Sequence, residues 1–420
     1  MEKKMESNKL GRRFWFSMLV FGLMGQIAWV VENMYFNVFI YNMFHASASD
    51  ISAMVMASAV VAALTTLIMG AVSDRIGRRK AFMSVGYMLW GVSIITFAYI
   101  RSVMLTIVMD CVMTFFGSTA NDAAYNAWLT DRGDSTNRGR IEGINSMMPL
   151  VSVLVVFGGF MSFNLESQSS WRTIYYIIGI ATFMIGVAGL FMIEESKDLK
   201  KDERPLASTL IYSFRPSVVK ENSLLYLVLG LFAVFGISIQ IFMPYIIIYY
   251  ERTLGISNYV LIMAPSIVLA SVVTALYGRI YDRKGFLYSM RPVVTMLISG
   301  YAILYFSRSI IHVAIGSLLG FSGYLTGMSV FGAMVRDNIP QNKAGQFQGV
   351  RIIAQVFVPG LIGPAIGSAV LKNAELIVNN DGTTSFLPNQ NIWSSALAVI
   401  VILCVLLFLV SKRMERNASR

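Results

Sequence analysis

Long apolar runs alternate with short polar loops along the whole chain of 420 residues. A helix needs about 20 apolar residues to cross the hydrocarbon core of a bilayer, and most of the runs have that length. Backbone groups in lipid must be hydrogen-bonded within their own segment, so we predict helices; the ten-residue alternating strands of a membrane barrel do not occur in this sequence. We number the runs as spans 1 to 12, at residues 14–43, 52–73, 81–100, 103–129, 141–165, 171–193, 223–250, 257–281, 292–307, 310–335, 346–374 and 392–411.

A charged loop occurs twice, at about half the chain length. The loop from Gly70 to Arg79 (GAVSDRIGRR) follows span 2, and the loop from Gly278 to Gly285 (GRIYDRKG) begins 208 residues later, after span 8. Asp131 after span 4 is matched by Asp337 at an offset of 206 residues. The chain is therefore predicted to be a duplication.

Parallel six-helix repeats in a membrane protein place the solute path between the two halves. We predict an all-α membrane protein made of two pseudo-symmetric six-helix bundles, residues 1–193 and 223–420. A hydrophilic linker at residues 194–222 joins them.

Lysine and arginine are concentrated at one end of the spans. Both termini and the loops after spans 2, 4, 6, 8 and 10 hold 29 of them, against 5 in the loops at the opposite end. Cytoplasmic loops carry this excess in membrane proteins, so we predict a multi-pass plasma-membrane protein with both termini in the cytoplasm.

Composition supports a membrane protein and argues against other classes. Hydrophobic residues make up 56% of the chain and charged residues 14%, which is too few charges to cover a soluble globule. The net charge of +11 comes from residues between apolar runs, so we expect a lipid bilayer as partner and no nucleic acid. The sequence has no phosphate-binding Gly-Lys-Ser/Thr loop and no metal-ligand spacing, so we expect no enzyme, no cofactor and no metal, and a monomer.

The loop from Gly70 to Arg79 resembles the signature between helices 2 and 3 of the major facilitator superfamily, with Val72 where leucine is more usual. The loop from Gly278 to Gly285 is similar to the weaker copy of that signature between helices 8 and 9. The segment DAAYNAWLTD from Asp122 to Asp131, followed by Arg138, resembles the sugar-cation symporters grouped with melibiose permease. That group commonly has acidic residues in helix 2, and span 2 has none before Asp74.

The superfamily resemblance implies a cytoplasmic gate. Asp74 would cap the start of another helix, expected to be span 11, while Arg75 and Arg78 pair with acidic groups at helix ends. The alternative is that the basic residues only set the orientation of the chain. The predicted gate consists of Gly70, Asp74, Arg75, Gly77, Arg78, Asp131, Arg138, Glu142, Asp282 and Arg283.

Span 1 carries a polar and aromatic stripe at helical spacing, formed by Gln26, Trp29, Asn33, Asn37 and Tyr41, with Glu32 at its flank. One face that lines a wet cavity explains this spacing, and polar contacts between helices are the alternative. Desolvation favours the protonated form of a carboxylate, so we predict that Glu32 carries the coupled proton.

Span 4 offers a second polar face. Asp122, Tyr125 and Asn126 stand at positions i, i+3 and i+4. Asp122 is predicted to bind the substrate or the coupling cation, with an internal salt bridge as the alternative. Asp110, nearer the other end of the span, fits a side chain that snorkels to the interface.

Hydroxyl, amide and aromatic side chains also occur within the spans of the second half, a mixture that is compatible with sugars and with many other polar solutes. Gln240 lies 208 residues after Glu32 and cannot titrate, so ion coupling is predicted to reside in the first half. The predicted substrate-binding residues are Gln26, Trp29, Asn33, Asn37, Tyr125, Asn126, Gln240, Tyr245, Tyr324, Arg351 and Gln355.

These patterns predict a secondary active transporter that works by alternating access and is driven by a proton or sodium gradient. A sugar or glycoside is the favoured solute. The alternative is efflux of drugs or metabolites by proton antiport. Efflux members of the superfamily tend to carry Gly-Pro-x-x-Gly-Gly in helix 5, and span 5 has Pro149, Gly158 and Gly159 in another arrangement.

Overall fold

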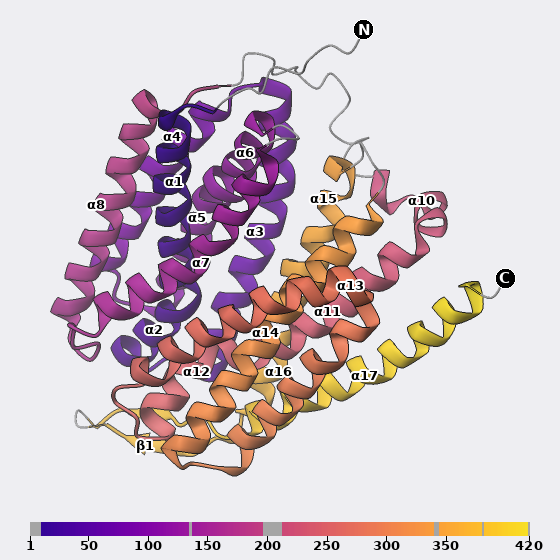
Figure 1. Ribbon diagram of the computed structural model, residues 1–420. Coiled ribbons are helices and arrows are strands. Elements are labelled where there is room, and N and C mark those ends of the chain that lie inside the picture. The colour runs from indigo at the N-terminus through magenta and orange to yellow at the C-terminus, as the bar shows by residue number, and fades with distance from the viewer. Residues whose placement is uncertain (1–9, 134–136, 196–211, 340–343, 380–381, 419–420) are drawn as a thin grey trace, which may run out of the picture. The chain divides into compact units, whose positions relative to one another are not determined.

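A computed structural model of the chain describes residues 10–133, 137–195, 212–339, 344–379 and 382–418. Within these ranges the chain is helical apart from loops and one small two-stranded sheet (Figure 1). We keep the span numbers for the membrane-crossing segments and use element labels for their parts.

The first half forms spans 1 to 6. Two of them, spans 1 and 4, contain a π-helical segment between α-helical parts. Span 1 is α1 (Arg12–Val30), η1 (Val31–Tyr35) and α2 (Phe36–Phe44), span 2 is α3 (Ala48–Ile76), span 3 is α4 (Arg79–Thr96) with η2 (Phe97–Tyr99), span 4 is α5 (Val103–Gly117), η3 (Ser118–Tyr125) and α6 (Asn126–Arg132), span 5 is α7 (Arg138–Phe160), and span 6 is α8 (Gln168–Met192).

The second half forms spans 7 to 12 after two short helices, η4 (Tyr212–Phe214) and α10 (Pro216–Glu221). Span 7 is α11 (Ser223–Phe242), η5 (Met243–Tyr245), α12 (Ile246–Ile248) and η6 (Tyr249–Thr253), spans 8 and 9 lie in α13 (Val260–Phe306), span 10 is α14 (Ile310–Asn338), span 11 is α15 (Ala344–Ile352), η7 (Ile353–Phe357) and α16 (Val358–Val370), β1 (Leu376–Val378) and β2 (Thr384–Phe386) follow, and span 12 is α17 (Asn391–Ala418).

Eleven helices among the described residues are long and apolar enough to cross a membrane. The longest, α13, has 47 residues and contains one non-helical residue, Gly285, with φ 74° and ψ −177°. Glycine adopts a positive φ at no steric cost, so the chain turns there and α13 is two spans. Gly77, 208 positions earlier, has φ 69°. The twelve predicted spans are confirmed, and the duplicated loop makes the same backbone turn in both copies.

The described chain divides into two compact units. Unit 1 contains Met1–Glu32 and Leu64–Thr209, and unit 2 contains Asn33–Ala63 and Leu210–Arg420. Spans 1 and 2 each contribute one part to either unit. The units follow packing, whereas the predicted domains, residues 1–193 and 223–420 with a linker at 194–222, follow the duplication and stay a prediction.

Small residues allow close helix packing inside unit 1. A Cβ atom on Gly91 of span 3 would lie 2.5 Å from the carbonyl oxygen of Gly179 in span 6 and 2.5 Å from the amide of Phe183. Around this contact Trp90 and Tyr175 are fully buried. Spans 3 and 6 are therefore in backbone contact, as small residues permit in membrane helices.

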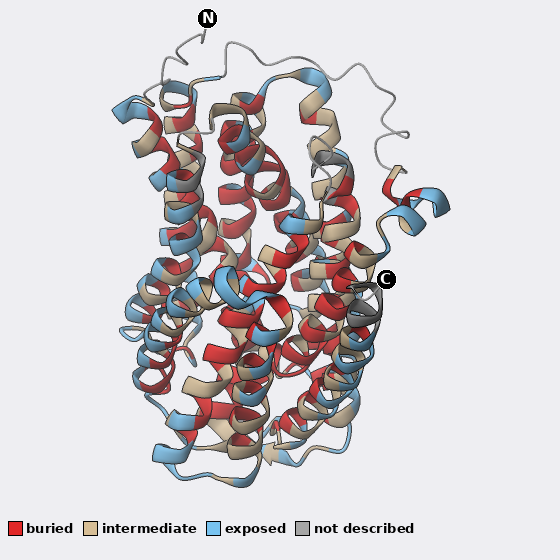
Figure 2. Ribbon diagram, turned by 45° about the vertical axis from the view of Figure 1, so that its right-hand side comes forward, coloured by how far each residue is buried: buried red, intermediate tan, exposed pale blue. Residues whose placement is uncertain are grey.

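The centre of unit 2 is aromatic. Phe232 of span 7 stacks on Phe331 of span 10, with ring centroids 5.0 Å apart, and Phe242 packs on Trp393 of span 12 at 4.6 Å. Buried residues lie where helices face one another, and exposed ones lie on outward faces (Figure 2). Many outward residues are large and apolar, among them Phe191 at 72% and Phe306 at 82% exposure, which suits contact with lipid.

Candidate functional site

Predicted site residues fall on the π-helical segments of the spans. Glu32 and Asn33 lie on η1, Asp122 and Tyr125 on η3, and Gln355 on η7. π-Helical turns are rare and occur mostly at functional sites, because the wider turn disturbs the regular ladder of hydrogen bonds. The backbone therefore marks the same positions as the polar side chains do.

Two asparagines occupy carbonyl groups of these segments. Asn37 Nδ2 donates to the carbonyl oxygen of Asn33 at 3.0 Å, and Asn126 Nδ2 donates to those of Asn121 at 3.3 Å and Asp122 at 3.1 Å. Both amides thereby satisfy backbone acceptors at a π segment. Asn37 is fully buried and Asn126 is exposed, so their amide nitrogens act within the helix, whatever their oxygens bind.

The centre of unit 1 holds three acidic side chains, Glu32, Asp110 and Asp122, which we call the carboxylate cluster. Glu32 is 7% exposed, and its Oε1 accepts a hydrogen bond of 2.8 Å from Thr114 Oγ1. Its Oε2 is buried and accepts no hydrogen bond from the described residues. Asp110 and Asp122 are the charged groups that interact with Glu32.

Asp110 lies on α5, one helical turn before Thr114, and is 1% exposed. The expectation that it snorkels to the interface is wrong, because the packed helices of unit 1 cover it. The sequence could not place it at this depth, since the ends of a span are uncertain by several residues.

Asp122 lies on η3 within reach of hydrogen bonds from Ser118, Asn121 and Trp29. Among the described residues it forms no ion pair. Trp29 in turn packs on Trp90, with ring centroids 5.1 Å apart, and half-buried Gln26 lies one turn earlier on α1. Neighbouring carboxylates repel each other when both are ionised, so the cluster favours uptake of a proton or a cation.

Tyr125, the third predicted residue of span 4, is 2% exposed. Its hydroxyl lies 3.0 Å from the carbonyl oxygen of Met18 and 3.2 Å from Asn145 Oδ1. A Cβ atom on Gly22 would lie 2.5 Å from that hydroxyl oxygen. Tyr125 thus joins span 4 to spans 1 and 5 through a gap that glycine leaves open.

The predicted residues of unit 2 do not form one cluster. Arg351 Nε donates to Gln355 Oε1 at 3.2 Å along span 11, and half-buried Gln240 packs under Gly363. Tyr245 is fully buried and donates to the carbonyl oxygen of Ala48 at 2.9 Å. Tyr324 lines a separate small cavity, together with Tyr250, Tyr301 and Trp393. Asn33 is exposed.

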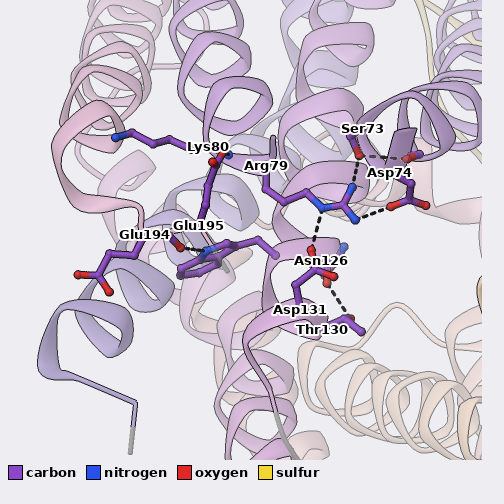
Figure 3. A network of polar contacts seen from close by, with 11 residues as sticks. Ser73, Asp74, Arg79, Lys80, Asn126, Thr130, Asp131, Glu194 and Glu195 are labelled. Carbon is purple, nitrogen blue, oxygen red and sulfur yellow. Dashed lines mark hydrogen bonds and ion pairs between the residues drawn. The ribbon is translucent and has the colours of Figure 1, made fainter. Parts of the chain in front are cut away.

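The charged loop of unit 1 is organised by Arg79, which the sequence did not single out (Figure 3). Arg79 Nε donates to Asp131 Oδ2 at 2.8 Å, and Nη1 donates to Ser73 Oγ at 2.5 Å. Its third donor, Nη2, forms an ion pair with Asp74. The side chain of Arg79 is 6% exposed, so one buried guanidinium joins the ends of spans 2 and 4.

Arg75 and Arg78 are exposed, and the recorded ion pairs of this loop within the described residues all involve Arg79. The capping of span 11 by Asp74 stays a prediction. The side chains of Arg138 and Glu142 lie outside the described residues. Gly70 has open space around it.

The second copy of the loop, in unit 2, uses another bond. Tyr281 Oη donates to Asp337 Oδ2 at 2.6 Å, whereas Asp282 and Arg283 are exposed. Tyr281 is 208 residues after Ser73, and Asp337 matches Asp131. The ends of spans 8 and 10 are therefore joined at the positions that Arg79 bridges in the first copy.

Glu194, at the end of span 6, forms a second network at the same end of unit 1. Its carboxylate pairs with Arg13 at 3.1 Å and with Arg132 at 3.3 Å, and its carbonyl accepts from Trp128 Nε1 at 2.8 Å. Glu195 accepts from the amide of Lys80 at 3.2 Å. Spans 1, 3 and 4 are thus tied to the residues that begin the predicted linker, which no sequence motif had indicated.

The family model of the Major Facilitator Superfamily matches residues 14–364. The chain belongs to this superfamily. Its fold is the twelve-helix, two-bundle fold that the repeat predicted, and it is the fold of transporters. The coarse function that follows is transport of a small solute across a membrane.

Solved structures of other superfamily members agree with this fold. The nucleoside transporter NupG has a TM-score of 0.74 at 12% identity, with 94% of this chain and 99% of NupG covered. A bacterial homolog of the human lysosomal transporter Spinster has a TM-score of 0.73 at 14% identity, covering 96% and 98%. The xylose transporter XylE from E. coli has a TM-score of 0.68 at 13% identity, covering 94% and 98%. No curated protein matches this superfamily member.

Proposed function

We propose that this superfamily member is a secondary active transporter of a small polar solute, with a sugar or glycoside as the favoured class. It works by alternating access and is coupled to a proton or sodium gradient. The observation that carries the proposal is the buried Glu32, whose strongest charged neighbours, Asp110 and Asp122, are both acidic. A buried carboxylate within a span is costly and serves ion coupling in many carriers.

Glu32 and Asp122 are proposed as the coupling residues, with Asp110 beside them. Thr114 fixes one oxygen of Glu32 and leaves the other for a proton or a monovalent cation. A divalent metal is not proposed, since the described residues contain no group of three or more His, Cys, Asp or Glu side chains arranged to hold one. Gln240 stands at the equivalent place in the second half and cannot titrate.

Two neighbours in fold support a polar, hydroxylated solute. NupG is a nucleoside transporter, and another structure with a TM-score of 0.70 is a D-xylose-proton symporter. We propose as substrate-contacting residues the half-buried Gln26, Trp29, Gln240, Tyr324, Arg351 and Gln355, since they retain accessible polar or aromatic groups, together with exposed Asn33 and Asn126.

The concentration of Lys and Arg at one end of the spans supports a plasma-membrane carrier with both termini in the cytoplasm. The predicted gate residues then lie at the cytoplasmic end, where Arg79 and Asp131 close the first half. We propose a monomer as the working unit.

The test is a stabilisation and transport series on the purified protein. Thermal unfolding is measured with sugars, glycosides, nucleosides and lipophilic cations, each with and without sodium. The stabilising solutes are then tested for uptake into proteoliposomes under an imposed pH or sodium gradient. Accumulation of a sugar or glycoside supports the proposal. Stabilisation by lipophilic cations alone, with proton-driven export, would replace it with the efflux alternative.

A further inference from the structure

A short β-hairpin connects spans 11 and 12 within unit 2. Strands β1 and β2 pair antiparallel, with Ile377 opposite Ser385, and Leu387 N donates to the carbonyl oxygen of Glu375 at 2.8 Å. Two strands of three residues do not form a stable hairpin alone in water. Contacts with the rest of unit 2 must therefore hold it.

The first of these contacts is an aromatic wedge. Phe386 is 7% exposed and packs edge-on against Tyr41 of span 1, at 5.3 Å between ring centroids, and against Tyr245 of span 7, at 6.2 Å. Tyr41 Oη also donates to the carbonyl oxygen of Phe386 at 2.7 Å, and both groups are buried. One hairpin residue thereby contacts spans from both repeats.

The second contact is polar and lies where span 1 ends. Asn379 Nδ2 is 2.9 Å from Ser385 Oγ and 3.1 Å from His45 Nδ1. His45 Nδ1 also lies 3.2 Å from Ser385 Oγ. His45 caps the end of α2 with a left-handed φ of 52°, so the end of the helix is fixed against the hairpin.

The third contact repeats the second by pseudo-symmetry. Thr253, which ends span 7, donates through its hydroxyl to the carbonyl oxygen of Pro388. Thr253 lies 208 residues after His45, the offset that relates the two repeats. The segment from Ser385 to Pro388 thus binds equivalent positions at the ends of spans 1 and 7.

In a two-repeat carrier the repeats separate first at one end and then at the other. Bonds from span 12's leading segment to span 1 join the two repeats, so they have to break when this end opens. We propose that residues 376–388 form a clasp that holds the ends of spans 1 and 7 together and releases when the carrier opens at that end. This inference rests on the proposed alternating-access function.

The test measures how readily a buried cysteine reacts with a maleimide in the purified protein. Ser52 of span 2 is 1% exposed and lies one turn beyond Ala48, which accepts the Tyr245 hydrogen bond. Ser52→Cys therefore reports separation at this end, in a background where Cys111 and Cys404 are replaced by serine. A second reporter, Ser289→Cys, is fully buried in span 9 near the charged loop and reports general loosening of unit 2.

We expect Phe386→Ala to raise the labelling rate of Ser52→Cys about tenfold, the change that roughly 1.4 kcal/mol produces in an equilibrium. Asn379→Ala raises it in the same direction, and the rate at Ser289→Cys does not change. Leu376→Ala is the matched control, because that side chain lies on the same hairpin and is 64% exposed.

Unchanged labelling of Ser52→Cys in both Phe386→Ala and Asn379→Ala would refute the clasp, and so would an equal rise at Ser289→Cys. If Phe386→Ala does not fold, as judged by size-exclusion chromatography, Asn379→Ala decides alone, since it removes only polar contacts. The assay needs no solute or gradient. Increased labelling in a protein that moves no solute would keep the clasp and reject the transport proposal, whereas normal transport with unchanged labelling would do the reverse.

Discussion

Arg79 donates from Nε to Asp131 at 2.8 Å, so the start of span 3 is held against the end of span 4. Arg79→Ala leaves two carboxylates without this cation, and we expect a loss of about 2 kcal/mol in the free energy of unfolding, below the value for a fully buried pair because Asp131 is 22% and Asp74 48% exposed. Arg78→Ala, its exposed neighbour, is expected to change stability by less than about 0.5 kcal/mol. Chemical unfolding in detergent compares them, and equal losses would contradict the role of Arg79.

Tyr281 and Asp337 make the corresponding bond in the second half, at 2.6 Å. Tyr281→Phe removes the donor and is expected to cost about 1 kcal/mol of stability, with no further loss when Asp337→Asn is added to it. Tyr277→Phe, one turn earlier on the same helix, is the control. An additive double variant would show that the two residues act independently.

Glu32→Gln tests coupling directly. The amide cannot exchange a proton, so solute exchange should continue while gradient-driven accumulation falls to a ratio of about 1, because a carrier without a coupled ion only equilibrates its solute. Glu221→Gln, exposed on α10, should accumulate solute as the parent does. Concentrative uptake by Glu32→Gln would remove Glu32 from the coupling step.

Thr114 provides the hydrogen bond to Glu32 Oε1. Thr114→Val keeps the shape and removes the hydroxyl, so we expect a loss of about 1 kcal/mol and a shift in the pH dependence of transport. Thr114→Ser should restore both properties. A pH profile identical to that of the parent in Thr114→Val would show that this bond does not influence the titration of the cluster.

Gly91→Ala tests the packing of spans 3 and 6. The added methyl group meets the backbone of Gly179 and Phe183 at 2.5 Å, so the helices must move apart, at a cost of about 2 kcal/mol. Gly158→Ala in span 5 meets nothing within 4 Å and should not destabilise the protein. Thermal unfolding of both variants decides, and an unaffected Gly91→Ala would mean that this contact is looser than the structure has it.

The spans and the duplicated loop were predictable because hydropathy and charge are local properties of the chain. Which of four consecutive basic residues points inward was not, because that depends on where the next helix begins. α4 begins at Arg79, after Gly77 turns the chain, and this phase buries Arg79 and exposes Arg78.

The depth of Asp110 and the hairpin were hidden for other reasons. Asp110 lies within a continuous apolar run, whose sequence does not define which residues are central. The strands of the hairpin have three residues each, too few to show an alternating pattern, so the polar turn between them dominates the sequence. The roles of Asn37 and Asn126 depend on π-helical turns, which no residue pattern announces.

The two repeats have diverged in length as well as in charge. Asp74 and Asp131 are 57 positions apart, whereas Asp282 and Asp337 are 55 apart. Within the longer interval lies η3, eight residues of π-helix, while its counterpart α14 is α-helical throughout. A π-helical turn fits an additional residue into a helix of given rise, so span 4 accommodates an insertion without breaking. Asp122 stands on that widened turn, and the duplicated scaffold therefore presents an acid from one copy only.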